Sequence, residues 1–255
     1  MSTLFELAPA YQLPWHLWIV ALLVGVIIGG SKAGIKGIGV FIVTIMAYLY
    51  GGRASTGIVL PLFMAGGVLA VWYYDRHAQW KYIIRLLPWM VIGVLIGVFV
   101  GKDLPEVIFK RGMAVIILLS VVMMFWWERN KTRRVPDNLA FAGLMGLCAG
   151  FTTMIGNLAG AFTNLFFLAI RLPKDQFIGT AAWLFFIINI FKLPFHIFVW
   201  ETVTLDSFAV NLRLIPGLLI GFYMGTRLVH KIKDQAYRKM ILFLTALGAI
   251  VIFFR

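Results

Sequence analysis

Apolar runs long enough to enter or cross a lipid bilayer follow one another along almost the whole chain, and this feature limits the possible folds most. They cover residues 15–30, 37–50, 57–74, 84–101, 112–127, 139–151, 156–170, 177–195, 208–229 and 237–254. A spanning helix needs about 20 residues, so the chain has room for about eight to ten membrane segments. Hydrophobic residues make up 62% and charged residues 13% of the chain, against roughly 45–50% and 25% in soluble domains. We therefore predict an all-α integral membrane protein with no soluble catalytic domain.

The order of the runs predicts two homologous halves related as inverted repeats. We divide the chain into a first membrane repeat at 1–128, a charged cytoplasmic connector at 129–137 and a second membrane repeat at 138–255. Residues that match at one constant spacing support this division: Gly25, Gly29, Gly39 and Phe41 in the first half, and Gly146, Gly150, Gly160 and Phe162 in the second. Each half has an odd number of runs, so the second copy is expected to enter the membrane the other way up.

Glycines spaced four apart mark the fourth run of each half. They are Gly93, Gly97 and Gly101 in the first half and Gly217, Gly221 and Gly225 in the second. Small residues at this spacing let helices approach closely in lipid. We therefore assign these glycines to helix packing and not to chemistry.

The distribution of Lys and Arg predicts the orientation of the chain. Placing the N-terminus outside puts more than twice as many of these residues in cytoplasmic loops as in outer loops, which is the bias expected of membrane proteins. Both termini then lie outside. The net charge of +13 follows from this bias, so we do not expect nucleic acid as a partner. The first two runs of each half are short, and charge alone leaves open whether they form two tilted spans or a re-entrant hairpin.

A glycine-rich break at residues 29–39 carries two lysines, Lys32 and Lys36, within apolar sequence. A charged side chain at bilayer depth costs about 2.5–3.5 kcal/mol, so such a break marks a partner or a pathway. The second half has a polar break at 151–157, and helices starting near Gly37 and after Gly156 would aim free N–H groups at one point. Such a point is a site for an anion. The candidate substrate-binding residues are Ser31, Lys32, Lys36, Gly37, Thr152, Thr153, Gly156 and Asn157. Alternatively, the lysines are ordinary charges in an aqueous loop.

A second polar cluster lies in the run at 177–195. Asn189 and Lys192 are three residues apart and share a helix face, so both are further candidates for substrate binding. Alternatively, Lys192 extends its ammonium group to the outer interface. We expect His196 to be interfacial.

Enzymatic motifs are absent from the sequence. We find no HExxH, no P-loop, no Ser-His-Asp set and no pair of carboxylates inside an apolar run. We therefore predict a protein that is not an enzyme, with no catalytic residues, no metal site and no cofactor. The expected partners are a small anionic substrate and the lipid bilayer, with homo-oligomer formation left open. The single cysteine, Cys148, is interpreted as a packing residue.

The short glycine motifs resemble those of the TauE/SafE family of sulfite exporters over essentially the whole chain. They are Gly34-Ile35-Lys36-Gly37-Ile38-Gly39, Gly156-Asn157-Leu158-Ala159-Gly160 and Gly179-Thr180-Ala181. The family's proline after each glycine-rich turn is missing, and Val43-Thr44 and Thr163-Asn164 stand in those regions. The resemblance implies a bacterial inner-membrane transporter, and the outer side to which the charge bias assigns both termini is then the periplasm. Its expected substrate is a small anion such as sulfite, a sulfonate or a related organic acid, with export as the expected direction. An anion channel and a membrane scaffold without a substrate are the alternatives.

Overall fold

The predicted all-α membrane architecture is confirmed over the part of the chain that the structure describes. The computed structural model describes residues 12–105 and 139–253, together with 107, 108, 111, 112, 115, 118, 119 and 122 between them. The helices are α1 (Trp15–Lys32), α2 (Gly39–Tyr50), α3 (Gly52–Tyr74), η3 (Asp75–His77), α4 (Trp80–Lys102), α6 (Leu139–Gly156), α7 (Ala159–Ala169), α8 (Lys174–Phe198), α9 (Leu205–His230) and α10 (Asp234–Phe253). Six of them are long and apolar enough to cross a membrane: α1, α3 with η3, α4, α6, α8 and α9. The predicted connector at 129–137 lies outside the described residues.

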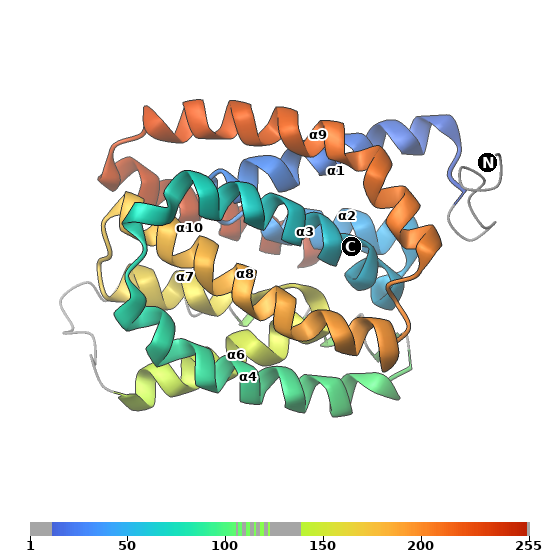
Figure 1. Ribbon diagram of the computed structural model, residues 1–255, viewed down its shortest axis with the longest axis horizontal. Coiled ribbons are helices and arrows are strands. Elements are labelled where there is room, and N and C mark those ends of the chain that lie inside the picture. The colour runs from blue at the N-terminus through green and yellow to red at the C-terminus, as the bar shows by residue number, and fades with distance from the viewer. Residues whose placement is uncertain are drawn as a thin grey trace.

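Two pairs of helices flank a central pair. Helix α1 packs along α9 on one flank, α4 packs along α6 on the other, and α3 and α8 cross between them (Figure 1). Each flanking pair therefore joins the first helix of one half to the fourth helix of the other half. This exchange of partners is the pattern that an internal two-fold relation between the halves would produce.

The spaced glycines allow the close approach in both flanking pairs. A methyl group added at Gly217 on α9 would lie 2.7 Å from the Leu22 carbonyl oxygen on α1. On the other flank, a methyl group at Gly97 on α4 would lie 2.8 Å from Cβ of Met154 on α6. Real side chains do not tolerate such distances, so the predicted packing role is confirmed at these positions.

The first two helices of each half run antiparallel and form a hairpin. In the first half, the end of α2 returns to the end of the bundle where α1 starts, and Gly51 alone separates it from α3 (Figure 1). In the second half, Phe141 near the start of α6 stacks on Phe166 near the end of α7, with ring centroids 5.8 Å apart. Both alternatives that the sequence left open, two tilted spans and a re-entrant hairpin, bring the two ends together in this way, and α1 and α6 are each long and apolar enough to cross a membrane.

The two hairpins open at opposite ends of the bundle (Figure 1). Helix α2 leads into the start of α3, whereas α7 leads into the start of α8. The start of α8 lies at the far end of α3, because the N–H group of Gln79, just after α3 and η3, donates to Thr180 Oγ1 at 2.9 Å. Inverted repeats require that the two hairpins enter the bundle from opposite ends, as they do here. The repeat relation itself stays a prediction.

Two buried tyrosines hold the turn after α1. The Tyr74 hydroxyl donates to the Ala33 carbonyl oxygen and the Tyr237 hydroxyl to the Gly34 carbonyl oxygen, each at 2.7 Å. Gly34 has a φ of 117°, a conformation that side chains with a Cβ rarely adopt. A Cβ at Gly34 would also lie 2.8 Å from Cδ1 of Ile178. The shape of this turn is therefore fixed by its surroundings.

Candidate functional site

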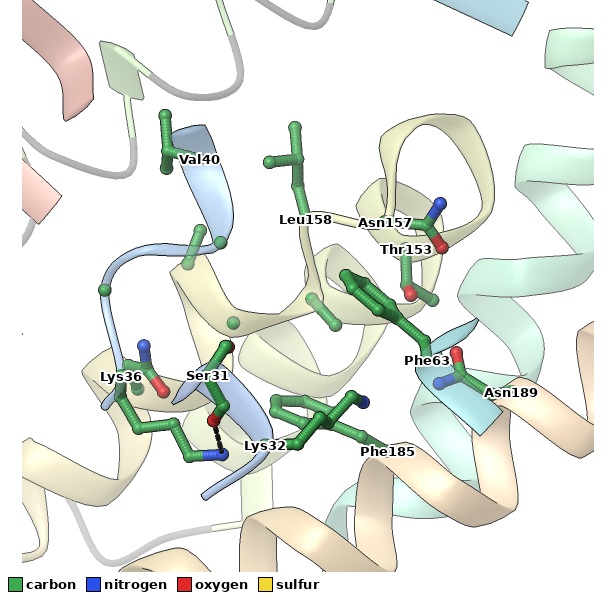
Figure 2. A pocket seen from close by; sticks show the side chains of 16 residues that line it. Ser31, Lys32, Lys36, Val40, Phe63, Thr153, Asn157, Leu158, Phe185 and Asn189 are labelled. Carbon is green, nitrogen blue, oxygen red and sulfur yellow. Dashed lines mark hydrogen bonds between the residues drawn. The ribbon is translucent and has the colours of Figure 1, made fainter. Parts of the chain in front are cut away.

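A cavity lies where the tips of the two hairpins approach each other between α3 and α8 (Figure 2). Its lining from the first hairpin is Ser31, Lys32, Lys36, Gly37, Gly39 and Val40, and from the second hairpin Thr153, Asn157, Leu158, Ala159, Gly160, Ala161 and Asn164. Phe63, Phe185 and Asn189 complete the lining. Phe63 is the middle residue of α3 and Phe185 lies near the middle of α8. Because both helices have membrane length, the cavity lies near half the depth of the bundle.

The two lysines of the first hairpin are buried at this cavity. Only 7% of Lys32 and 5% of Lys36 is exposed, so the alternative of an ordinary aqueous loop is wrong. The Lys36 Nζ atom donates to the Ser31 carbonyl oxygen at 3.3 Å, the dashed line in Figure 2. The Lys32 Nζ atom lies 4.5 Å from the centroid of the Phe63 ring, close enough for a cation–π interaction.

The ammonium group of Lys32 donates no hydrogen bond within the described part of the chain. Among the described residues, its Nζ atom contacts aromatic rings and has no hydrogen-bond acceptor. An ammonium group has three donors. The cavity therefore holds a buried cation that a bound anion could satisfy.

The N-termini of two helices face the same cavity. Helix α2 begins at Gly39, slightly later than the start near Gly37 that the sequence suggested, and α7 begins at Ala159, after Gly156 as expected. Lining residues include the first two of each helix: Gly39, Val40, Ala159 and Gly160. The first N–H groups of a helix have no partner within it, and the aligned peptide dipoles make this end positive. Gly156 is instead the last residue of α6 and does not line the cavity.

Two buried asparagines add amide groups to the lining. Asn189, predicted from the sequence, lies on α8 with its side chain in the wall of the cavity (Figure 2). Asn164 on α7 also lines the cavity, and its Oδ1 atom is buried without a hydrogen-bond partner among the described residues. Sequence reasoning missed Asn164 as a candidate. The available signal was an amide within the short apolar run at 156–170.

Three of the predicted residues lie outside the lining: Thr152, Gly156 and Lys192. The Thr152 hydroxyl donates to the Ala149 carbonyl oxygen at 3.2 Å, within its own helix. Lys192 is fully buried at 0% exposure, so the idea that it extends to the interface is wrong. Its Nζ atom donates to the Thr153 carbonyl oxygen at 2.8 Å, to Thr153 Oγ1 at 3.1 Å and to Asn157 Oδ1.

His196 is fully buried, so the expectation that it is interfacial is wrong. Its Nδ1 atom lies 2.8 Å from Thr202 Oγ1. Its Nε2 atom has no hydrogen-bond partner in the described part of the chain. His196 lies one helical turn beyond Lys192 on α8 and outside the cavity lining.

No carboxylate among the described residues lines the cavity. The described acids lie at helix ends or in connections: Asp75, Asp103, Asp175, Glu201, Asp206 and Asp234. The cavity thus combines two buried lysines, two helix N-termini and amide groups without a compensating negative charge. This set suits an anion, because hydrogen bonds to a charged group and opposite charges in a low dielectric are both strong.

A family model described as Sulfite exporter TauE/SafE matches residues 11–252, which is nearly the whole chain. No curated protein matches the chain, and no solved structure does.

Proposed function

This chain belongs to the TauE/SafE sulfite exporter family, and from that premise we propose that it is a secondary transporter of a small anion. Sulfite, a sulfonate or a related organic acid is the proposed substrate. The observation that carries the proposal is the convergence of Lys32, Lys36 and the N-termini of α2 and α7 on one cavity without an acid. The cavity lies near mid-depth at the tips of two interrupted hairpins, which is where many secondary transporters bind their substrates.

Each group has a separate role in the proposal. Lys32 supplies a free ammonium group, and Lys36 supplies a second one that Ser31 already orients. Gly39, Val40, Ala159 and Gly160 offer backbone N–H groups whose geometry is fixed by the helices. The amide Nδ2 groups of Asn189 and Asn164 donate to the remaining oxygen atoms, and the rings of Phe63 and Phe185 exclude water.

The opposite entry of the two hairpins suggests how the cavity is reached from either side. Helices α1 and α9 pack as one flank and α4 and α6 as the other. A small rotation of one flank against the other opens the cavity first at one end of the bundle and then at the other. This is the alternating access expected when two halves surround one site.

The charged residues support one orientation of the chain in the membrane. The end of the bundle that holds the connection between α3 and α4 carries Arg76, Lys81, Arg171, Lys174, Lys231 and Lys233. By the positive-inside bias this end faces the cytoplasm. Both termini then face the periplasm, and we propose that the protein lies in the bacterial inner membrane.

The test is flux of labelled sulfite in liposomes that contain the purified protein, with sulfonates and carboxylates as competitors. A transporter gives saturable flux and accelerated exchange when substrate is present on both sides. Flux that rises linearly with concentration and shows no accelerated exchange indicates an anion channel. No flux of any tested anion would contradict the proposal.

A further inference from the structure

A buried lysine from α8 holds the tip of the second hairpin from behind the wall of the cavity. We propose that Lys192 is a positioning residue: it occupies the acceptor oxygen atoms of Asn157 and Thr153, so that both residues present hydrogen-bond donors to the anion. The inference rests on the proposed transport function and deepens it, because it adds two ligands to the anion site and names the residue that orients them. Lys192 itself lies outside the lining of the cavity.

Three oxygen atoms surround the Nζ atom of Lys192. They are the Thr153 carbonyl oxygen at 2.8 Å, the Thr153 hydroxyl oxygen at 3.1 Å and Oδ1 of Asn157. An ammonium group has three N–H donors and no acceptor, so each donor has one oxygen atom here. The hydrogen bonds of Lys192 therefore reach the cavity only through Thr153 and Asn157, which both line it.

The two hydrogen bonds of the Asn157 side chain allow one orientation of its amide. Oδ1 accepts from the Lys192 ammonium, which can only donate. Nδ2 donates at 3.0 Å to the Thr56 carbonyl oxygen on α3, which can only accept. An amide turned over would place its NH2 group against the ammonium and its oxygen against the carbonyl oxygen, and both contacts would be lost. The surrounding network thus defines which atom of the amide is the nitrogen.

One N–H bond of the Asn157 amide remains for a ligand. An NH2 group has two hydrogen atoms, and the described residues supply one acceptor for them, the Thr56 carbonyl oxygen. Asn157 is one of the lining side chains drawn in Figure 2. Its oxygen, which would repel an anion, is turned to Lys192 instead. The amide therefore acts toward the anion as a donor.

The Thr153 hydroxyl is committed in the same way. Its oxygen accepts from Lys192, and its own hydrogen atom has no acceptor among the described residues. The neighbouring Thr152 hydroxyl instead donates to the Ala149 carbonyl oxygen within α6, as threonine side chains in helices often do. Thr153 lines the cavity and Thr152 does not. Lys192 thus leaves the Thr153 hydroxyl as a second donor for the anion.

Lys192 also holds the turn that aims α7 at the cavity. The Thr153 carbonyl oxygen accepts from Lys192 and, at 3.1 Å, from the backbone N–H group of Asn157. Asn157 is one of two residues between α6 and α7. Its φ of 56° is a conformation that needs local support. The lysine therefore ties the last turn of α6 to the start of α7, whose first residues line the cavity.

A lysine behind the wall also attracts an anion through space, and this effect has to be separated from orientation. Coulomb attraction depends on charge and distance, so it acts whether or not the Asn157 side chain is present. Orientation of the amide acts only through that side chain. Measuring the effect of Lys192 with and without the Asn157 amide therefore distinguishes the two.

The experiment measures the Kd of labelled sulfite for the purified full-length chain, together with the Tm of each variant. Lys192→Met removes the three donors and keeps an unbranched side chain. Asn157→Gly removes the amide and suits the positive φ. Asn157→Asp also suits this backbone; it keeps an oxygen for Lys192 and replaces the donating nitrogen by a second oxygen. Lys174→Met is the matched control, since Lys174 at the start of the same helix also donates to carbonyl oxygen atoms, those of Val229 and Ile232, outside the cavity lining.

We expect Lys192→Met to raise the Kd of sulfite by about tenfold, because one hydrogen bond to a charged ligand loses its fixed donor. Asn157→Asp should raise the Kd by about tenfold or more, although its carboxylate still accepts from Lys192. In the Asn157→Gly background, Lys192→Met should change the Kd much less than in the parent, because residues that act as a unit do not contribute additively. Lys174→Met should bind sulfite like the parent.

Three results would overturn the inference and leave the transport function intact. Parent-like binding by Lys192→Met shows that Lys192 positions no ligand, and parent-like binding by Asn157→Asp shows that the amide donates nothing to the anion. An equal effect of Lys192→Met in the parent and in Asn157→Gly shows that the lysine acts by its charge alone. If Lys192→Met does not fold, Lys192→Gln takes its place in the same comparison.

Binding and flux together separate this inference from the function on which it rests. A parent protein that binds no sulfite contradicts both. A parent that binds sulfite with the expected pattern among the variants, but moves none in liposomes, contradicts transport and leaves the positioning role of Lys192 standing.

Discussion

Replacing Lys32 by methionine should weaken anion binding and at the same time stabilise the empty protein. Methionine has a similar length and no charge, so the variant removes the ammonium group while largely filling its space. In the described structure this ammonium has no hydrogen-bond acceptor. Without a bound anion, Lys32 is thus a buried charge that, among the described residues, is stabilised only by the rings of Phe63 and Phe185.

The magnitude follows from the interaction that is lost. A hydrogen bond to a charged group contributes about 1.5–3 kcal/mol, and about 1.4 kcal/mol corresponds to a tenfold change in Kd. Lys32→Met should therefore raise the Kd by about 10- to 150-fold. Lys36→Met should have a smaller effect, because the Lys36 ammonium already donates to the Ser31 carbonyl oxygen.

Thermal unfolding of the purified protein, followed with and without sulfite, measures both effects. In the absence of ligand the variant should unfold at a higher temperature than the parent, because a buried unpaired charge is costly. The upward shift of Tm that ligand gives the parent should be largely lost. A Lys32→Met protein with lower Tm and an undiminished ligand shift would refute the assignment of Lys32 to the anion.

Three other predictions test the helix packing at Gly29, the role of the Asn164 amide and the orientation of the chain in the membrane. Gly29→Ala should destabilise the fold by about 1–3 kcal/mol or more, because its methyl group would overlap the backbone carbonyl oxygen of Leu218 on α9. Gly30→Ala meets nothing closer than 3.4 Å and should have a smaller effect; Tm measures both. Asn164→Leu should weaken sulfite binding by about fivefold, the loss of one hydrogen bond of about 1 kcal/mol, with unfolding temperature as the check on folding. A cysteine introduced at Glu201 should react with a membrane-impermeant maleimide in spheroplasts, whereas one at Lys81 should react only after permeabilisation.

The helices and the hairpin tips could be predicted from the sequence because their signals are local. Apolar runs, glycine spacing and a pair of lysines in an apolar stretch each need only neighbouring residues to be recognised. Seven of the ten candidate residues line one cavity, since the polar breaks of both halves mark the interruptions of the helices. Their role as substrate ligands stays a prediction.

The remaining features depend on contacts between distant segments. Nothing near Lys192 in the sequence shows that its ammonium reaches the end of α6, 39 positions away. The burial of His196 depends on Trp200 and Thr202 folding back over it, and its place near the end of an apolar run suggested an interface instead.

The central claim is that Lys32 and Lys36 bind a transported anion together, and sulfite counterflow in liposomes tests it most directly. Vesicles loaded with unlabelled sulfite and diluted into labelled sulfite should accumulate label transiently when they contain the parent protein. The double variant Lys32→Met/Lys36→Met should accumulate none, and Lys174→Met should match the parent. Parent-like counterflow in the double variant would contradict the claim.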